Sequence, residues 1–379
     1  MACIYADNAA TTRLSDTAFD AMKPFMLAEY GNASTLYKLG RSAHKAVENA
    51  RGVFAKGINA YPAEIYFTSG GTESDNWAIK GTAHRLAASG KKHIVTDNIE
   101  HHAVLHSAKA LEREGFEVTY VSADNNGLVR AEDVAAAIRP DTAMVSVMFA
   151  NNELGTIQPV AEIGSICRSA GVLFHCDAVQ AAGILPIDVK QMNIDLLSMS
   201  AHKFHGPKGV GVMYARRDCV PETYIDGGEQ ERGHRAGTEN VAGIVGAAAA
   251  FAEAMSERNE KAERLCAMRD EIQSGLMKIP GSQVNGVTAP RLPGTLNMSF
   301  DGIDGQSLIF ELDLKGLAAS SGSACASGSV NPSHVLLALG LPYKLAHGSL
   351  RLSLGKYNTS DEAEMIIRIV SDTVAELRG

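Results

Sequence analysis

The sequence lacks the features that mark several classes of protein. Lys and Arg total 35 against 43 Asp and Glu, which gives a net charge of -8 and no basic excess to indicate a nucleic-acid surface. The six cysteines form no C-x-x-C pair, which argues against a disulfide framework and against a thiolate zinc site. The longest uncharged apolar stretch, 241–252, is too short to cross a bilayer. The N-terminus has no basic region followed by an apolar run, so we expect no signal peptide and a cytoplasmic protein without a membrane partner.

What the chain does have is length and an ordinary globular composition. Its 379 residues exceed one compact domain, and 45% of them are hydrophobic. We expect a large domain over 13–255 and a smaller C-terminal domain over 256–379. The first segment, 1–12, is expected to pack against the smaller domain.

Short apolar runs alternate with helical patterns through the first part of the chain. Runs at 93–97, 117–122, 143–150, 172–177, 196–200 and 209–214 predict strands, and 103–114, 131–138 and 160–170 predict helices. This alternation predicts an α/β fold with a mostly parallel sheet covered by helices. An apolar helix at 241–255 and an amphipathic one at 256–277 follow. Strands at 295–299 and 349–353 and a helix at 360–377 indicate an α+β second domain.

Chemistry-bearing residues gather where the predicted strands end, which is where open α/β sheets bind ligands. A glycine-rich segment with Gly71 and Thr72 follows the strand-like run 65–68 and opens a helix. Small residues and free N–H groups at a helix start can hold a phosphate. An ordinary helix N-cap is the alternative reading of the same residues.

An acid stands at the end of another buried run. Asp177 follows 172–176, where an unpaired carboxylate is costly. A protonated pyridine nitrogen would be a suitable partner, and Gln180 could donate to an oxygen on such a ring. A helix N-cap role for Asp177 stays open.

Lys203 follows the next strand, in the order Ser200-Ala201-His202-Lys203. A partly desolvated lysine amine is a competent nucleophile, and Ser200 and His202 are placed to reach a phosphate. Most lysines are simple surface residues. Together with Asp177 and the glycine-rich segment, Lys203 predicts a pyridoxal 5′-phosphate enzyme with this lysine as the Schiff base.

Two histidines, His101 and His102, follow the strand 93–97. Either could stack on an aromatic cofactor and move a proton near neutral pH, or simply begin a helix in solvent. A metal site built from His101, His102, His175 and His202 is not favoured, so no metal is predicted.

Cys325 lies in a run of small residues, 318–329. Such a run cannot anchor itself in a core, so we expect an exposed thiol suited to attack or to carry a group. A linker with an incidental cysteine is the alternative. Asn152, at a strand end, and Arg351, on the strand 349–353, could bind an amino-acid carboxylate.

Seven ordered segments now carry a family resemblance. SGGTESDN, EHHAV, NNE-x-G, HCDAVQ, S-x-HK-x-x-GPKG, R-x-GTEN and SSGSACASG run nearly end to end. Together they resemble the class I cysteine desulfurases of the NifS/IscS type. The resemblance implies a fold-type I pyridoxal-phosphate transferase of the aminotransferase superfamily, acting as a homodimer on L-cysteine.

The resemblance also implies a role for each matching residue. The roles are Lys203 for the Schiff base, Asp177 for the pyridine nitrogen, Gln180 for the ring hydroxyl, His101 for stacking, Gly71, Thr72, Ser200 and His202 for the phosphate, Thr238 for the phosphate of the other subunit, Asn152 and Arg351 for the substrate carboxylate, and Cys325 for the sulfur.

The implied reaction turns L-cysteine into L-alanine and leaves a persulfide on Cys325, for transfer to an iron–sulfur scaffold protein or another acceptor. The chain ends soon after Arg351, before the longer tail that helps many family members dock a scaffold protein. Selenocysteine lyase or aminotransferase activity on the same fold is the alternative enzyme reading. A non-catalytic sulfur carrier is the alternative of another class. Nitrogenase, general cluster assembly and tRNA thiolation stay open as destinations of the sulfur, as does the exact proton-transfer role of His101.

Overall fold

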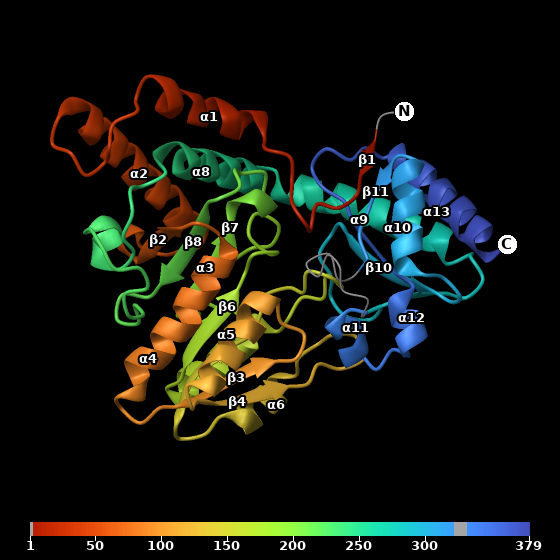
Figure 1. Cartoon of the computed structure of the whole chain (residues 1–379), viewed down its shortest axis with the longest axis horizontal. Helices are drawn as coiled ribbons and strands as arrows, with labels where there is room; N and C mark the ends of the chain where they lie inside the picture. The colour runs from red at the N-terminus through yellow and green to blue at the C-terminus, as the bar shows by residue number, and fades with distance from the viewer. Residues whose placement is uncertain (1–2, 322–331) are drawn as a thin grey trace.

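The computed structural model describes residues 3–321 and 332–379 (Figure 1). Its main sheet has seven strands in the order β2-β8-β7-β6-β5-β3-β4. Their bounds are β2 Ile65–Thr68, β3 His93–Asp97, β4 Glu117–Val121, β5 Thr142–Ser146, β6 Leu173–Asp177, β7 Leu196–Ser200 and β8 Gly211–Ala215. Five neighbouring strands, from β4 to β7, run parallel, whereas β8 is antiparallel to both of its neighbours. The prediction of a mostly parallel sheet is therefore confirmed.

Helices cover both faces of this sheet. They are α1 Asp16–Leu27, α2 Lys38–Gly57, α3 Gly71–Asn76, α4 Thr82–Ala87, α5 His102–Arg113, α6 Ala131–Ala137, α7 Val160–Ala170 and α8 Val241–Ser256. A π-helical turn, Trp77–Gly81, joins α3 to α4. Because side chains alternate across a strand, Phe67 packs with α2 and α8, whereas its neighbour Tyr66 packs with Trp77 on the other face.

The remainder of the chain forms two small sheets. Antiparallel β9 Ser282–Val284, β10 Thr295–Phe300 and β12 Ser349–Ser353 make one sheet, and β1 Ile4–Tyr5 pairs with β11 Leu317–Ala318 in the other. Helices α9 Arg258–Leu276, α10 Gly305–Leu314 and α13 Glu362–Arg378 share an apolar cluster with Ile4 and Ala6.

Two short helices join the two parts of the chain. Helices α11 His334–Ala338 and α12 Tyr343–His347 send Val335, Leu336 and Ala346 into the core cluster of the main sheet. The division of the chain at residue 255 stays a prediction.

Several boundaries differ from the sequence prediction. The two helices predicted at 241–255 and 256–277 are present as α8 and α9, and they are separated at Glu257, close to the predicted division. The strand predicted to reach residue 150 ends at Ser146, and residues beyond it, Met148 and Ala150, line a cavity instead. No prediction covers α1, α2 and α10. Every helix in the described part of the chain falls short of the length and apolarity that a membrane crossing needs.

The aromatic packing behind α2 gives a stability prediction. Phe54 is fully buried, its ring lies 4.9 Å from that of Phe251, and it also contacts Phe204, the residue after Lys203. Phe54→Ala should lower the free energy of unfolding by about 3–5 kcal/mol, because it leaves a cavity in a close-packed core. Phe310→Ala, at a position 62% exposed, is the matched control and should change it by less than about 0.5 kcal/mol. Urea unfolding followed by circular dichroism measures both, and equal losses would contradict the assignment of this core.

Candidate active site

A cavity of about 270 Å³ lies at the carboxyl edge of the parallel strands. Strands β6 and β7 end there, at Asp177 and Ser200. Parallel strands deliver their last residues to one edge of a sheet, so segments far apart in sequence meet at this point. The lining residues are Ala9, Ala10, Gly71, Thr72, Asp75, His101, Met148, Ala150, Asn152, Asp177, Val179, Gln180, Ser200, His202, Lys203 and Arg351.

Most of the residues singled out in the sequence meet in this one cavity. Ten of them line it: Gly71, Thr72, His101, Asn152, Asp177, Gln180, Ser200, His202, Lys203 and Arg351. Thr238 does not line it among the described residues and is exposed instead. Cys325 lies outside the described residues.

Two buried acids form one wall of the cavity. Asp177 accepts a hydrogen bond from the backbone N–H of Val179 at 2.8 Å, and burial raises its pKa to about 6. Burial, and then the charge of Asp177, raise the pKa of Asp75 well above its usual range. The Oδ1 atom of Asp75 has no hydrogen-bond partner among the described residues. Two neighbouring desolvated carboxyl groups are not both ionised at little cost. The site therefore favours a ligand that presents a protonated, positively charged group to these acids from the cavity.

His175 is a buried neighbour of Asp75. Its Nδ1 hydrogen-bonds with Ser146 Oγ at 2.9 Å and its Nε2 with Ser198 Oγ at 3.1 Å. Nε2 also lies 3.6 Å from Asp75 Oδ1. Burial lowers the pKa of His175 to about 3, so the ring is neutral and fixed in place rather than a proton carrier.

Lys203 enters the cavity from a single turn, Ala201–Lys203, directly after β7. Its Nζ donates to the carbonyl oxygens of Ala9 at 2.5 Å and Ala10 at 2.9 Å. Gln180 Nε2 donates to the same Ala9 oxygen at 3.0 Å. Residues 9–10 of the N-terminal segment thus hold two of the predicted cofactor-binding side chains, a role that no sequence motif signals.

The opposite end of the cavity suits an anion. Gly71 and Thr72 begin the helical stretch that runs from α3 into α4. A Cβ at Gly71 would meet Val179 Cγ2 at 2.6 Å, so glycine lets the start of α3 pack closely against Val179 at the cavity wall. His202 Nδ1 hydrogen-bonds with Thr11 Oγ1 at 3.0 Å, and burial lowers the pKa of His202 to about 4. Backbone N–H groups, a neutral imidazole and Ser200 are thus donors that could bind a phosphate.

His101 stands at the start of α5. Its Nδ1 accepts a hydrogen bond from the backbone N–H of Ala103 at 3.1 Å, which fixes the ring at the cavity wall. Burial first, and then the charge of Lys203, lower its pKa to about 4. A neutral imidazole at this place can accept a proton at neutral pH.

Arg351 reaches the cavity from β12. Its side chain is 2% exposed, and its guanidinium pairs with Asp7 Oδ1 at 2.7 Å and donates to the backbone oxygen of Asn152 at 3.0 Å. Its Nε is buried and has no partner in the described part of the chain. An arginine fixed on two sides with a donor unused can bind a small carboxylate.

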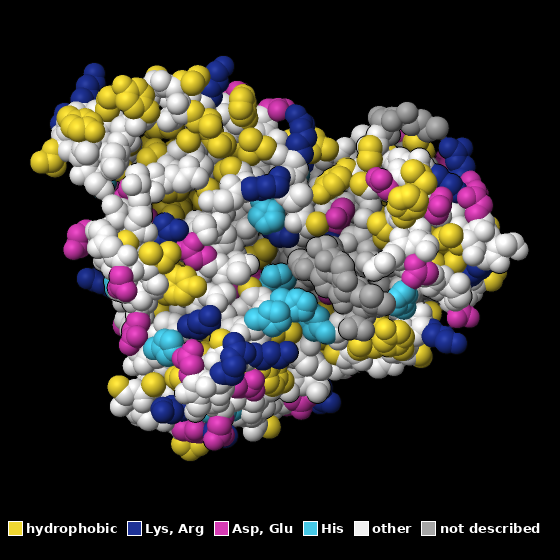
Figure 2. All heavy atoms as spheres, in the orientation of Figure 1, with side chains coloured by type: hydrophobic (Ala, Val, Ile, Leu, Met, Phe, Trp, Pro, Cys, Tyr) yellow, Lys and Arg dark blue, Asp and Glu magenta, His cyan; other side chains and the backbone are white. Residues whose placement is uncertain are grey.

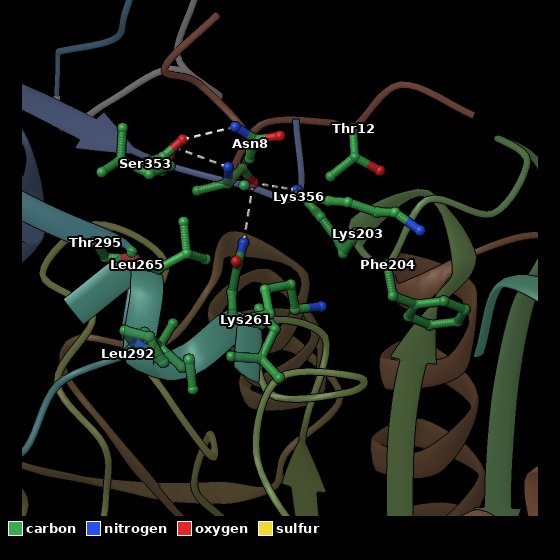
Figure 3. Close-up of a pocket in the computed structure, with 18 of the residues that line it drawn as sticks. Asn8, Thr12, Lys203, Phe204, Lys261, Leu265, Leu292, Thr295, Ser353 and Lys356 are labelled. Atoms are coloured by element: carbon green, nitrogen blue, oxygen red, sulfur yellow. Dashed lines mark hydrogen bonds between the residues drawn. The ribbon is translucent and has the colours of Figure 1, made fainter. Parts of the chain in front are cut away.

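A second, smaller cavity of about 50 Å³ adjoins the first and shares Ala9, Gln180 and Lys203 with it. Figure 3 shows Asn8 and Ser353 above it, where Asn8 Nδ2 donates to the Ser353 carbonyl oxygen at 2.9 Å. Ala9 N–H also donates to Ser353 Oγ at 2.9 Å. These bonds tie the N-terminal segment to β12, and so set the distance between Lys203 and Arg351.

The residues of the larger cavity fit pyridoxal phosphate. Lys203 supplies an amine that could bind the cofactor aldehyde, and the buried acids Asp177 and Asp75 could pair with its ring nitrogen. The helix start at Gly71 suits its phosphate. Asp75, His101 and Asp177 each offer one atom that could bind a metal, and these three atoms lie within 4.8 Å of one another. A cofactor ring held against the acids and His101 would account for this set without a metal.

Replacing the buried acid tests this assignment. Asp177→Asn should weaken binding of pyridoxal phosphate by about tenfold to a hundredfold, because a hydrogen bond to a charged group contributes about 1.5–3 kcal/mol. Asp133→Asn, at an exposed position of α6, is the matched control. Equilibrium dialysis of the apoproteins measures both, and the same dissociation constant in the two variants would rule out the pairing.

Comparisons with known proteins agree with this geometry. The family model for Aminotransferase class-V matches residues 4–366. "Cysteine desulfurase IscS" of Methanosarcina thermophila is 50% identical over 376 residues, which cover 99% of this chain and 93% of that protein. The protein of the same name from Clostridium botulinum is 49% identical over 378 residues, covering 99% and 95%.

Solved structures are similar over the same length. A "NIFS-LIKE PROTEIN" superimposes with a TM-score of 0.93 at 40% identity and covers 99% of this chain and 100% of that one. The structure "SspA in complex with cysteine" has a TM-score of 0.83 at 35% identity and covers 94% and 100%. The fold is thus that of the NifS-like pyridoxal-phosphate enzymes. The chain belongs to the class-V aminotransferase family and, within it, to the cysteine desulfurases of the NifS/IscS type.

Proposed function

We propose that this protein takes the sulfur of L-cysteine, leaves L-alanine, and carries the sulfur as a persulfide on Cys325. The observation that carries the proposal is the cavity that brings Lys203, Asp177 and Arg351 together from three distant segments. A pyridoxal-phosphate enzyme that acts on an amino acid needs an amine to bind the cofactor, an acid to pair with the ring nitrogen and a cation to bind the substrate carboxylate. The relatives named cysteine desulfurase, about half identical over the whole chain, support the choice of substrate.

Binding and orientation of the substrate fall to two residues. Arg351 is held by Asp7 and the Asn152 backbone and lines the cavity, where its guanidinium binds the substrate carboxylate. The Asn152 side chain lies at the same wall of the cavity and donates a further hydrogen bond. The Cα atom of L-cysteine is thereby turned toward Lys203.

Proton movements fall to Lys203 and His101. Pyridoxal phosphate, when bound, supplies an electron sink that makes the Cα proton of the substrate acidic. Lys203 Nζ takes that proton, and Asp177 keeps the ring nitrogen protonated. His101, neutral because burial holds its pKa near 4, takes a proton near the substrate thiol.

Sulfur transfer falls to Cys325. Its thiolate forms an S–S bond with the substrate sulfur while the Cβ–S bond breaks. The electron pair of that bond stays on carbon, which is protonated to become the methyl group of alanine. Atoms and electrons balance as L-cysteine and a thiol give L-alanine and a persulfide, so no outside oxidant is needed.

We further propose that an iron–sulfur scaffold protein receives the sulfur. The name of the similar IscS proteins supports this acceptor, whereas tRNA thiolation or nitrogenase clusters are further destinations for the same persulfide. A pull-down with the persulfide-loaded protein distinguishes them by the acceptor that it retains.

A homodimer working in the cytoplasm is part of the same proposal. Large apolar side chains are exposed on α1 and in the loop before α2, and Figure 2 shows hydrophobic side chains gathered over these helices. They are Phe19, Met26, Leu27, Tyr30, Leu36 and Tyr37. Contiguous apolar surface of this kind favours association. Thr238 is exposed and away from the cavity of its own chain, which suits a contact with the phosphate of a partner subunit.

The lysine assignment has a spectroscopic test. Lys203→Ala should abolish the Schiff-base absorbance of the bound cofactor, because no amine then remains to link it covalently. Lys208→Ala removes an exposed lysine of the same loop and should leave the spectrum intact. Absorbance spectra of the purified proteins give the answer, and a Lys203→Ala spectrum like that of the wild type would overturn the assignment.

The sulfur acceptor has a chemical test. Cys325→Ser should still change its visible spectrum when L-cysteine is added, but should release no sulfide in the presence of a reductant. Cys266→Ser, in a half-buried position of α9, is the control and should release sulfide normally. Sulfide is assayed together with alanine, and undiminished sulfide from Cys325→Ser would remove this residue from the mechanism.

A further inference from the structure

The chain on either side of Cys325 is anchored beside the active site. The structure describes the chain up to Ser321 and again from Pro332, and Cys325 belongs to the interval between them. Each of the two described ends makes hydrogen bonds to a segment that also contributes a residue to the cavity. The groups that make these bonds are therefore candidates for residues that position the sulfur acceptor.

The end before Cys325 pairs with β12. The backbone N–H of Ser320 donates to the carbonyl oxygen of Arg351 at 3.2 Å, and the N–H of Arg351 donates to the Ser320 oxygen at 2.6 Å. These two bonds form an antiparallel bridge. The side chain of the same Arg351 lines the cavity. This end is thus held by the residue proposed to bind the substrate carboxylate.

The end after Cys325 is held through a side chain. Ser333 is the N-cap of α11, where its Oγ accepts from the backbone N–H of Val335 at 3.0 Å. The same hydroxyl donates to Oε2 of Glu153, and both side chains are buried. A hydroxyl can accept and donate at once, so one serine both begins the helix and binds Glu153.

Glu153 belongs to a turn that the fold fixes on several sides. Asn151 Oδ1 accepts from two backbone N–H groups of the turn, that of Glu153 among them, at 2.9 Å each. The Glu153 carbonyl oxygen accepts from Asn297 Nδ2, on β10, at 3.1 Å. Asn152, in the same turn, lines the cavity, and its carbonyl oxygen accepts from Arg351. Glu153 therefore has a fixed position relative to the residues proposed to bind the substrate carboxylate.

The Glu153 carboxyl group depends on its serine partner. Burial raises its pKa to about 7, whereas the hydrogen bond from Ser333 and the charge of Arg351 counteract that rise. A buried acceptor that loses its donor is costly, so the pair should stay together in the folded protein. Glu153 is not among the described residues that line the cavity, so it would act through Ser333 rather than on the substrate.

We propose that Glu153 is a positioning residue for sulfur transfer, because its bond to Ser333 ties the chain after Cys325 to the turn that carries Asn152. The proposal rests on the function proposed above, in which Cys325 takes the sulfur. The bridge between Ser320 and Arg351 anchors the other end. Two anchors beside the substrate site raise the effective concentration of the thiol there, which favours its attack on the substrate sulfur.

Replacement of the two paired side chains tests the proposal in the holoprotein. Glu153→Ala removes the acceptor and leaves the N-cap of α11 in place, whereas Ser333→Ala removes the donor. With enzyme in excess over L-cysteine, we expect both variants to form alanine about tenfold or more slowly than the wild type. The visible spectral change on adding L-cysteine reports substrate binding, and its half-saturating concentration should stay within about twofold.

Two further variants separate positioning from stability. Glu153→Gln keeps an acceptor oxygen for the Ser333 hydroxyl and should restore most of the rate. Ser307→Ala removes a comparable bond at the start of α10, that of Ser307 Oγ to Asp304 Oδ1 at 2.7 Å, and should form alanine as the wild type does.

Wild-type rates of alanine formation in both Glu153→Ala and Ser333→Ala would refute the proposal, as would an equal loss of rate in Glu153→Gln. A loss of cofactor or substrate binding large enough to explain the slower rate would also refute it, because the bond would then serve the fold alone. Failure of the proposed function has a different signature. In that case Cys325→Ser itself would release sulfide normally, whatever the rates of the Glu153 variants.

Discussion

The buried carboxyl group of Asp177 is the constraint on which the rest of the site depends. Burial raises its pKa, and a second buried acid, Asp75, stands beside it. Such a pair is tolerable only when a proton or a cation shares the site. A protonated ring nitrogen would meet that need, whereas the neighbouring His175, held neutral between two serines, adds no charge.

A second constraint comes from the N-terminal segment. Its backbone oxygens at Ala9 and Ala10 accept from Lys203, and Asp7 holds Arg351. One short stretch of chain thus positions both the amine expected to bind the cofactor and the cation expected to bind the substrate. Because backbone groups make several of these bonds, their positions depend on the path of the segment more than on its side chains.

The fold was largely predictable from the sequence, for a physical reason. Buried parallel strands need continuous apolar runs, and the helices between them need a 3.6-residue period, so β3, β7 and α7 were predicted with the bounds that the structure has. Less regular places were harder. The strand predicted over 143–150 ends at Ser146, because the apolar residues beyond it line the cavity instead of continuing the sheet.

The sequence by itself determined which reactive groups the protein has. They are a lysine, an acid and a glycine-rich turn, each directly after an apolar run, and a cysteine among small residues. The tertiary structure alone decided which further groups join them. Ala9 lies 194 positions from Lys203 in the chain, and His334 lies far from His102, yet each pair is in contact. Local patterns report on neighbours within a turn or a strand, whereas contacts at such separations arise only when packing of the whole core fixes the paths of distant segments.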